Sequence, residues 1–409
     1  MKTNALVAGV GMTTFGRHMG RNLKSLAGEA ILQALKDAGI SPGELEAAYM
    51  GNAAAAVITG QMCVPGEIVL REVGIGGIPV VNVENACATG STAFNQAVAM
   101  VTAGAYDVVL ACGYEKLVHE DKAKSFSVFA GAADVELQAE LEATVNARMK
   151  AAGMTVTEGG QRSVFMDIYA MMTADHMQKY GTTREQIAAV SAKNSFHGSM
   201  NPRAQFRDVV TVEQVLAARE IAYPLTLPMC SPIGDGAAAV VVVSERKARE
   251  LGLSKPVRVL SSAFKTGWDF AEGESEASVF EATIAQAYEE AGVGPSDLSV
   301  VELHDASAPS EIIHTEYLGL CPKGEGGLLV ESGATRLGGR IPVSTSGGLL
   351  RKGHPIGATG IAQIVELTEQ LQGRSGARQV ESARIGLAEN GGGFVKDSVA
   401  ALIVTILAV

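Results

Sequence analysis

The chain has 409 residues, of which 47% are hydrophobic and 19% are charged. This length predicts two to three domains or one fold built twice, and the low share of charged residues excludes an intrinsically disordered chain and a coiled coil. The 33 Lys and Arg against 44 Asp and Glu give a net charge of -11 without a basic run, so we expect no nucleic acid partner. The apolar ends are too short to span a bilayer and neither is arranged as a signal peptide. We therefore expect no membrane association and a location in the cytoplasm.

The cysteines are odd in number, widely spaced and include no C-x-x-C pair. This pattern argues against a disulfide framework and a structural zinc site, so we expect reduced thiols and no bound metal. The five are Cys63, Cys87, Cys112, Cys230 and Cys321. The 47 glycines, against 11 Phe, 8 Tyr and 1 Trp, favour an α/β enzyme with many tight turns.

The first predicted elements of the chain return in the same order in its last third. Hydrophobic patterning predicts a strand, a helix that stops at a glycine and a proline, and a second strand, twice over. These elements are expected at residues 5–10, 26–38 and 45–50, and again at 257–263, 277–291 and 298–303. The segment 34–42 aligns with 287–295 at an offset of 253 residues, so the sequence predicts a duplicated fold.

Two further segments support the duplication. Each begins with Ala-Thr-Gly, at Ala88 and at Ala358, and continues without a charged residue as far as Asp107 and Glu366. Because a helix without charges must be covered on every side, we expect these two helices to lie together between two sheets, in a five-layered α/β/α/β/α arrangement. Strands at 108–112 and 385–389 should follow them.

The duplication suggests a division of the chain into three parts. Residues 1–120 form the first half, which is completed by 235–254, and residues 255–409 form the second half. The more charged segment 121–234 is predicted to be an inserted lobe of helices and loops.

Cys87 and His354 each lie just before one of the two uncharged helices. A thiol at a helix N-terminus has a lowered pKa and is nucleophilic, although a buried cysteine can also be a small hydrophobic residue. The residues around His354, Gly353 and Pro355, fix the backbone and let a substrate come close. If the duplication holds, His354 faces Cys87 across a pseudo-twofold axis and can act as its base.

Two other groups end predicted strands. His304 and Asp305 follow the strand 298–303, where catalytic groups of α/β folds gather, although Asp305 could simply cap a helix. Glu389 precedes three glycines, Gly391–Gly393, and could be a general acid or base or could hold backbone amides. The N–H groups of the glycines could stabilise an oxyanion.

Other common catalytic and metal-binding motifs are absent from the sequence or stand in the wrong structural context. The sequence has no G-x-G-x-x-G, P-loop or H-E-x-x-H motif, and its single G-x-S-x-G, at 39–43, stands between a helix and a strand and indicates a helix stop. The remaining histidines show no metal-ligand spacing, so surface or packing roles are expected for them: His18, His119, His176, His197 and His314.

Taken together, these motifs resemble those of the thiolase superfamily and, within it, the sterol carrier protein 2 type branch. The resemblance covers essentially the whole chain. It rests on Asn85-Ala-Cys-Ala-Thr-Gly90, Ser231-Pro-Ile-Gly-Asp-Gly-Ala-Ala-Ala239, His304-Asp-Ala-Ser307, Gly347-Gly-Leu-Leu-Arg-Lys-Gly-His-Pro-Ile-Gly-Ala-Thr-Gly360 and Gly391-Gly-Gly393. His304 stands where ordinary thiolases have an asparagine, which favours the sterol carrier branch.

The resemblance implies a mechanism. Cys87, activated by His354, attacks the keto carbon of a 3-oxoacyl-CoA, and free CoA then takes the acyl group from the cysteine. Backbone N–H groups of Cys87 and Gly391 serve the tetrahedral oxyanion, while His304 and His354 serve the thioester enolate. It further implies that coenzyme A is a co-substrate, that no cofactor is tightly bound, and that the inserted lobe helps to hold CoA. The expected CoA contacts are Asn390, Gly392, Ser346 and Gly347, with Lys193 and Arg203 as candidates for its phosphates.

The sequence departs from the family pattern at the second acid–base group. Ordinary thiolases have a cysteine at the position of Glu389, and the sterol carrier branch has one at the position of Ala306. Glu389 is therefore expected to exchange the proton at the α-carbon, with a pKa raised by burial.

This departure leaves several functions open. The first is a thiolase for a branched or aromatic 3-oxoacyl-CoA such as benzoylsuccinyl-CoA, working with a small zinc-ribbon and OB-fold partner. The others are a thiolase-like C-acyltransferase or retro-aldolase acting on CoA esters, and a non-catalytic subunit that has kept the fold. A homodimer or tetramer is expected from the family.

Overall fold

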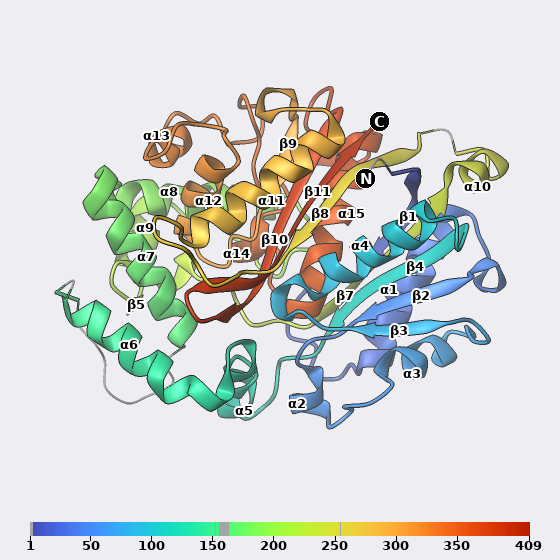
Figure 1. Cartoon of the computed structure of the whole chain (residues 1–409), viewed down its shortest axis with the longest axis horizontal. Helices are drawn as coiled ribbons and strands as arrows, with labels where there is room; N and C mark the ends of the chain where they lie inside the picture. The colour runs from blue at the N-terminus through green and yellow to red at the C-terminus, as the bar shows by residue number, and fades with distance from the viewer. Residues whose placement is uncertain (1–2, 152, 155–162, 254) are drawn as a thin grey trace.

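In the computed structural model, nine strands form one hydrogen-bonded sheet (Figure 1). The described residues are 3–151, 153–154, 163–253 and 255–409. The strands are β1 (Ala5–Met12), β2 (Ala47–Gly51), β3 (Val80–Val83), β4 (Val108–Glu115), β7 (Gly236–Ser244), β8 (Val257–Lys265), β9 (Val300–Glu302), β10 (Ile385–Val395) and β11 (Ser398–Ala408). Their order across the sheet is β3-β2-β4-β7-β1-β8-β11-β10-β9.

The sheet consists of two halves that meet at β1 and β8. These two strands pair only through Leu6 with Arg258 and Val7 with Val257, whereas β1 pairs with β7 along its whole length. In the first half, β1 is followed by α1 (Leu23–Ala38) and β2; in the second, β8 is followed by α11 (Glu276–Ala291) and β9. Both helices have 16 residues and end at a glycine in the left-handed conformation. The predicted repeat is therefore present in the structure.

The two uncharged helices lie at the centre of the molecule. They are α4 (Thr89–Thr102) and α15 (Thr359–Gln372), which pack against each other and against strands of both halves (Figure 1). Side chains on one face of β1, such as Val7, belong to this central core, while its neighbour Leu6 faces α1 on the other side. Helix α11 covers the outer face of the second half. These contacts give the predicted five layers.

The segment between β4 and β7 forms a helical lobe. It contains α5 (Lys122–Ser127), α6 (Gln138–Ala151), α7 (Val164–Tyr180), α8 (Arg184–Ser199), α9 (Val212–Ala217), β5 (Glu220–Ala222) and β6 (Leu225–Thr226). An apolar core joins this lobe, green in Figure 1, to helices of the second half, chiefly α12 (Ala308–Tyr317), α13 (Gly326–Glu331) and α14 (Gly348–Arg351). The remaining short helices are α2 (Ala55–Thr59), α3 (Pro65–Glu72) and α10 (Glu245–Glu250). The predicted boundaries at 120, 234 and 254 stay predictions.

This arrangement brings distant segments of the chain to one place. Short 3₁₀ turns, Ala86–Ala88 and Ile356–Ala358, precede α4 and α15 and contact each other. Strand β10 runs parallel to β9 with Ala388 opposite Glu302, so the residues after each of these two lie side by side. Among the described helices, none is long and apolar enough to cross a membrane.

Candidate active site

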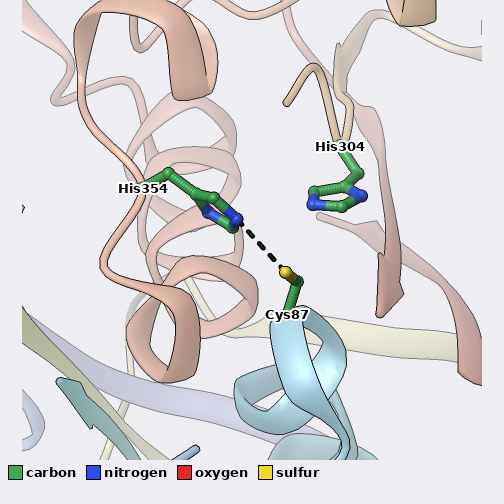
Figure 2. A group of neighbouring side chains, drawn as sticks. All are labelled: Cys87, His304 and His354. Atoms are coloured by element: carbon green, nitrogen blue, oxygen red, sulfur yellow. Dashed lines mark hydrogen bonds between the residues drawn. The ribbon is translucent and has the colours of Figure 1, made fainter. Parts of the chain in front are cut away.

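Cys87 and His354 face each other where the two central helices begin (Figure 2). The distance between Nε2 of His354 and Sγ of Cys87 is 3.3 Å. Glycines permit this approach, because a Cβ atom on Gly113 would lie 2.2 Å from the carbonyl oxygen of Gly357 and one on Gly90 would lie 2.8 Å from it. The residue before the thiol, Ala86, has a positive φ of 47°. The duplicated fold thus brings the two predicted groups into hydrogen-bonding contact.

The hydrogen bonds of Thr359 fix the tautomer of His354. The Thr359 hydroxyl donates to the carbonyl oxygen of Pro355 at 3.1 Å and lies 2.7 Å from Nδ1 of His354. Because a hydroxyl has a single proton to donate, Thr359 accepts from Nδ1–H. Nε2 therefore carries the lone pair and can accept the proton of the Cys87 thiol.

Both members of the pair are uncharged at neutral pH. Burial, followed by the charges of His304 and Lys352, holds the pKa of His354 well below its ordinary value. Burial, followed by the nearby carboxylate of Glu115, raises the pKa of Cys87 to about 12. The expected lowering of the thiol pKa is wrong, since burial and Glu115 outweigh the helix terminus. The arrangement is a thiol that transfers its proton to a neutral imidazole as it attacks, rather than a stable thiolate.

His304 completes a group of three side chains (Figure 2). It follows β9, and its ring centroid lies 5.3 Å from that of His354. Burial lowers its pKa to about 4, so the ring is neutral, and its buried Nε2 has no hydrogen-bond partner among the described residues. One ligand atom from each of Cys87, His304 and His354 lies within 4.8 Å of the others, a set that could also hold a metal ion. The predicted absence of a metal stays a prediction.

Glu389 lies behind these side chains. Its carboxylate is fully buried and is absent from the wall of the cavity described below. Its Oε2 accepts the backbone N–H of His304 at 3.1 Å and lies 2.9 Å from Nδ1 of His314. Burial raises its pKa, but His314 and His304 together outweigh burial and lower it. The expected raised pKa is therefore wrong, and a buried, ionised carboxylate does not fit direct proton transfer to a substrate.

A cavity of about 1010 Å³ opens over the three side chains. Gly391 and Gly392 line it together with Cys87, His304 and His354. Much of its remaining wall is aromatic: Phe126, Phe129, Phe165, Tyr169, Phe206, Phe280 and Phe394. Three cationic side chains also line it: Arg17, Lys122 and Arg219. The cavity can thus accept an apolar acyl group and offers positive charges to an anionic carrier.

Several predicted CoA contacts lie elsewhere. Of the four, only Gly392 lines the cavity. The Ser346 hydroxyl donates to Glu302 at 2.6 Å, and Oδ1 of Asn390 accepts from Ser91 at 2.8 Å. Gly347 packs so closely on Gly198 that a Cβ atom would lie 2.7 Å from its Cα. All three residues are buried and are used within the protein framework, Asn390 inside strand β10 and the other two just before α14.

The predicted phosphate contacts are also used internally. Lys193 is buried and forms an ion pair of 3.1 Å with Glu311, and Arg203 forms one of 2.5 Å with Glu369. Neither lines the cavity. Sequence reasoning missed Arg17, Lys122 and Arg219, because nothing local distinguishes them from other surface cations. It also missed His314, which lines the cavity from α12.

Comparisons with known proteins identify the family. Residues 5–221 match the model of the thiolase N-terminal domain, and residues 272–405 match that of the thiolase C-terminal domain. The chain is 40% identical to an acetyl-CoA acetyltransferase of Methanothermobacter thermautotrophicus, over 95% of this chain and 96% of that protein. It is 36% identical to the benzoylsuccinyl-CoA thiolase subunit BbsB of Thauera aromatica, over 93% and 92%. Bovine sterol carrier protein 2 is also 36% identical, over 95% of this chain and 70% of that protein.

Solved structures agree on the fold. An Ltp2–ChsH2(DUF35) aldolase superposes with a TM-score of 0.77 at 24% identity, covering 99% of this chain and 98% of that one. Human mitochondrial 3-ketoacyl-CoA thiolase superposes with a TM-score of 0.71 at 17% identity, with the same coverage. Together with the family models, these matches confirm the duplicated fold. The chain therefore belongs to the thiolase family and is an acyltransferase.

Proposed function

We propose that this protein is a thiolase that cleaves a 3-oxoacyl-CoA with free CoA through an acyl-enzyme on Cys87. The observation that carries the proposal is the 3.3 Å contact between the Cys87 thiol and the unprotonated Nε2 of His354 at the floor of the cavity. In the first step the sulfur attacks the keto carbon, C3, while His354 takes the thiol proton. The bond between C2 and C3 then breaks, and its electron pair moves to the thioester as an enolate.

The surrounding groups suit the negative charge that develops. His304 is a neutral ring at the cavity wall and can donate a hydrogen bond from a protonated nitrogen without carrying a full charge. Nε2 of His354 becomes a second donor once it has taken the thiol proton. Backbone N–H groups of Cys87 and Gly391 are the proposed donors to the tetrahedral oxyanion. In the second half of the reaction the thiol of CoA attacks the acyl carbon, and Cys87 leaves and regains its proton from His354.

We propose a branched or aromatic acyl group. The cavity wall is rich in phenylalanine, and the relative at 36% identity is named for benzoylsuccinyl-CoA. The lobe supplies many of these rings, including Phe165 and Tyr169 on α7. The cations Arg17, Lys122 and Arg219 are the proposed contacts for the phosphates of CoA, in place of Lys193 and Arg203.

The assembly is also a proposal. Strand β3 is an edge strand, and Val81 on it is 46% exposed, which favours a homodimer through this edge. A small partner subunit agrees with the name of the relative BbsB, which is one subunit of a thiolase. The location in the cytoplasm stays a prediction.

The test is intact-protein mass spectrometry after brief incubation with a panel of acyl-CoA and 3-oxoacyl-CoA esters. In wild type we expect a mass gain equal to the acyl group, which free CoA removes. Cys87→Ala should show no gain. The added mass identifies the preferred acyl group. If no ester, with or without a co-expressed partner, modifies the folded wild type, the acyl-enzyme mechanism is wrong.

A further inference from the structure

The proposed reaction needs a second proton-transfer group. When C2 separates from C3 it must receive a proton, but His354 holds the proton of Cys87 at that moment. Ala306 has no proton to give, and Glu389 is ionised and shielded from the cavity. A side chain that lines the cavity and lies close to His304 has to supply the proton.

His314 is in that position. It projects from α12 into the cavity wall that also contains His304 and Gly391. Its Nδ1 lies 2.9 Å from Oε2 of Glu389, the same oxygen that accepts the backbone N–H of His304. The carboxylate of Glu389 therefore holds the His314 ring close to the backbone of His304.

The bond to Glu389 also determines which nitrogen can react. An ionised carboxylate only accepts hydrogen bonds, so Nδ1 of His314 donates to it. Among the described residues, no group forms a hydrogen bond with Nε2 of His314. Nε2 is thus the atom left for a substrate, as in the dyads in which a carboxylate orients a histidine.

Neighbouring rings hold His314 in place. The ring of Phe280, on α11, lies 4.9 Å from it between centroids, and that of Tyr317, on its own helix, lies 6.1 Å away in a stacked orientation. The charged or titratable groups that face it are Glu389 from β10, His304 after β9 and Glu276 from α11. Burial raises the pKa of Glu276 to about 6, and His314 acts against that rise. The His314 ring thus lies between two carboxylates and one neutral ring.

We propose that His314, oriented by Glu389, is the second acid–base residue of this enzyme and takes the place of the missing cysteine. This inference rests on the proposed thiolase reaction. As the C2–C3 bond breaks, its electron pair stays on C2, and the proton on Nε2 of His314 moves to C2. After the shorter CoA ester leaves, Nε2 of His314 regains a proton from water, and the incoming CoA thiol gives its proton to water as its sulfur attacks the acyl carbon. Glu389 remains a positioning residue throughout.

The test separates proton transfer at C2 from attack by Cys87. In His314→Asn the amide can still donate to Glu389 from near the position of Nδ1, but Nε2 is gone. The acyl-CoA that best acylates wild type is incubated in D₂O, and deuterium uptake at C2 is followed together with acylation of Cys87. We expect deuterium uptake to fall roughly 10²- to 10⁴-fold, with acylation of Cys87 within about tenfold of wild type.

Two variants complete the design. Glu389→Gln should lower deuterium uptake less than His314→Asn does, and Glu389→Asp should recover part of the loss. Glu276→Gln, which alters the other carboxylate facing His314, should leave uptake near the wild-type rate. If His314→Asn fails to fold, His314→Gln replaces it.

The outcomes separate the two proposals. Wild-type deuterium uptake in His314→Asn, or its loss in Glu276→Gln instead, overturns the role of His314 and leaves the acyl-enzyme mechanism intact. Loss of Cys87 acylation in His314→Asn in parallel with uptake also overturns it, because the side chain would then be structural. Absence of acylation in wild type contradicts the proposed function itself.

Discussion

The starts of α4 and α15 are equivalent by duplication, yet one carries the nucleophile and the other carries its base. Each helix has 14 residues and follows a three-residue 3₁₀ turn. Aligning Ala88-Thr-Gly90 with Ala358-Thr-Gly360 places Asn85 opposite Pro355 and Glu84 opposite His354. Two equivalent helix starts therefore position two different chemical groups.

The difference lies in what the equivalent threonines accept. Thr89 accepts the backbone N–H of Asn85 at 2.9 Å, a normal turn contact. Proline has no N–H, so the equivalent Thr359 has no such donor from Pro355 and accepts Nδ1–H of His354 instead, at 2.7 Å. The comparison suggests that one proline converts a structural threonine into a support for the catalytic base.

The largest effect is expected where the two segments differ most. His354→Asn removes Nε2, so C–C cleavage should fall roughly 10²- to 10⁴-fold, because the Cys87 thiol loses its base. Glu84→Gln, at the equivalent position, should cleave the substrate at nearly the wild-type rate. Initial rates of 3-oxoacyl-CoA cleavage measure both. Similar rates for the two variants would refute the assignment of His354 as the base.

The second effect concerns the charge of Cys87. Because its pKa is about 12, the reactive thiolate should increase about tenfold per pH unit between about pH 7 and about pH 9. Alkylation of Cys87 by iodoacetamide should rise with pH in that proportion without levelling off. Peptide mass spectrometry is needed, because Cys63 is exposed and reacts independently.

Glu115→Gln provides the control for this pH dependence. Removal of the carboxylate charge near the thiol should lower the pKa of Cys87 and accelerate alkylation at any given pH in this range. A plateau below about pH 8 in wild type would instead indicate a lowered thiol pKa, the value expected from a helix terminus alone.

The repeated elements and the pairing of the two helix starts could be predicted from the sequence. The repeated order of strand, helix and strand, with a glycine at the end of each helix, predicted α1 and α11 because turn residues act locally. The two uncharged segments predicted a buried pair of helices, and their symmetry predicted that Cys87 and His354 face each other. These inferences needed only patterns that repeat along the chain.

The rest depends on contacts between distant residues. The raised pKa of Cys87 comes from burial and from Glu115, at the end of β4, and neither is visible in the residues around the thiol. The lowered pKa of Glu389 comes from His314, 75 residues away in sequence. Lys193 was predicted to contact a phosphate of CoA because the sequence alone does not show that it is paired with the buried Glu311.

The third effect tests the two threonines directly. Thr359→Val removes the acceptor of Nδ1–H and frees the His354 ring to change tautomer, so kcat should fall about tenfold, the equivalent of one good hydrogen bond. Thr89→Val removes the acceptor of a backbone N–H, so it should cost about 1 kcal/mol of unfolding free energy with little change in kcat. Steady-state kinetics and denaturant unfolding distinguish the two. Equal losses of kcat would mean that the threonines have the same role.

The smallest effect isolates the proline. Pro355→Ala restores an N–H at the position of Asn85, and this donor should compete with His354 for Thr359, so that kcat falls by less than about tenfold. The reverse change is not a fair test, because Asn85 has a φ of -157°, which proline cannot adopt, whereas Pro355 has a φ of -67°. The double variant Pro355→Ala with Thr359→Val supplies the missing control. If the proline acts by leaving Thr359 free for His354, its replacement should cost nothing further once Thr359 is gone. If the two losses simply add, the proline acts through backbone rigidity alone, and the threonines do not explain the difference between the two helix starts.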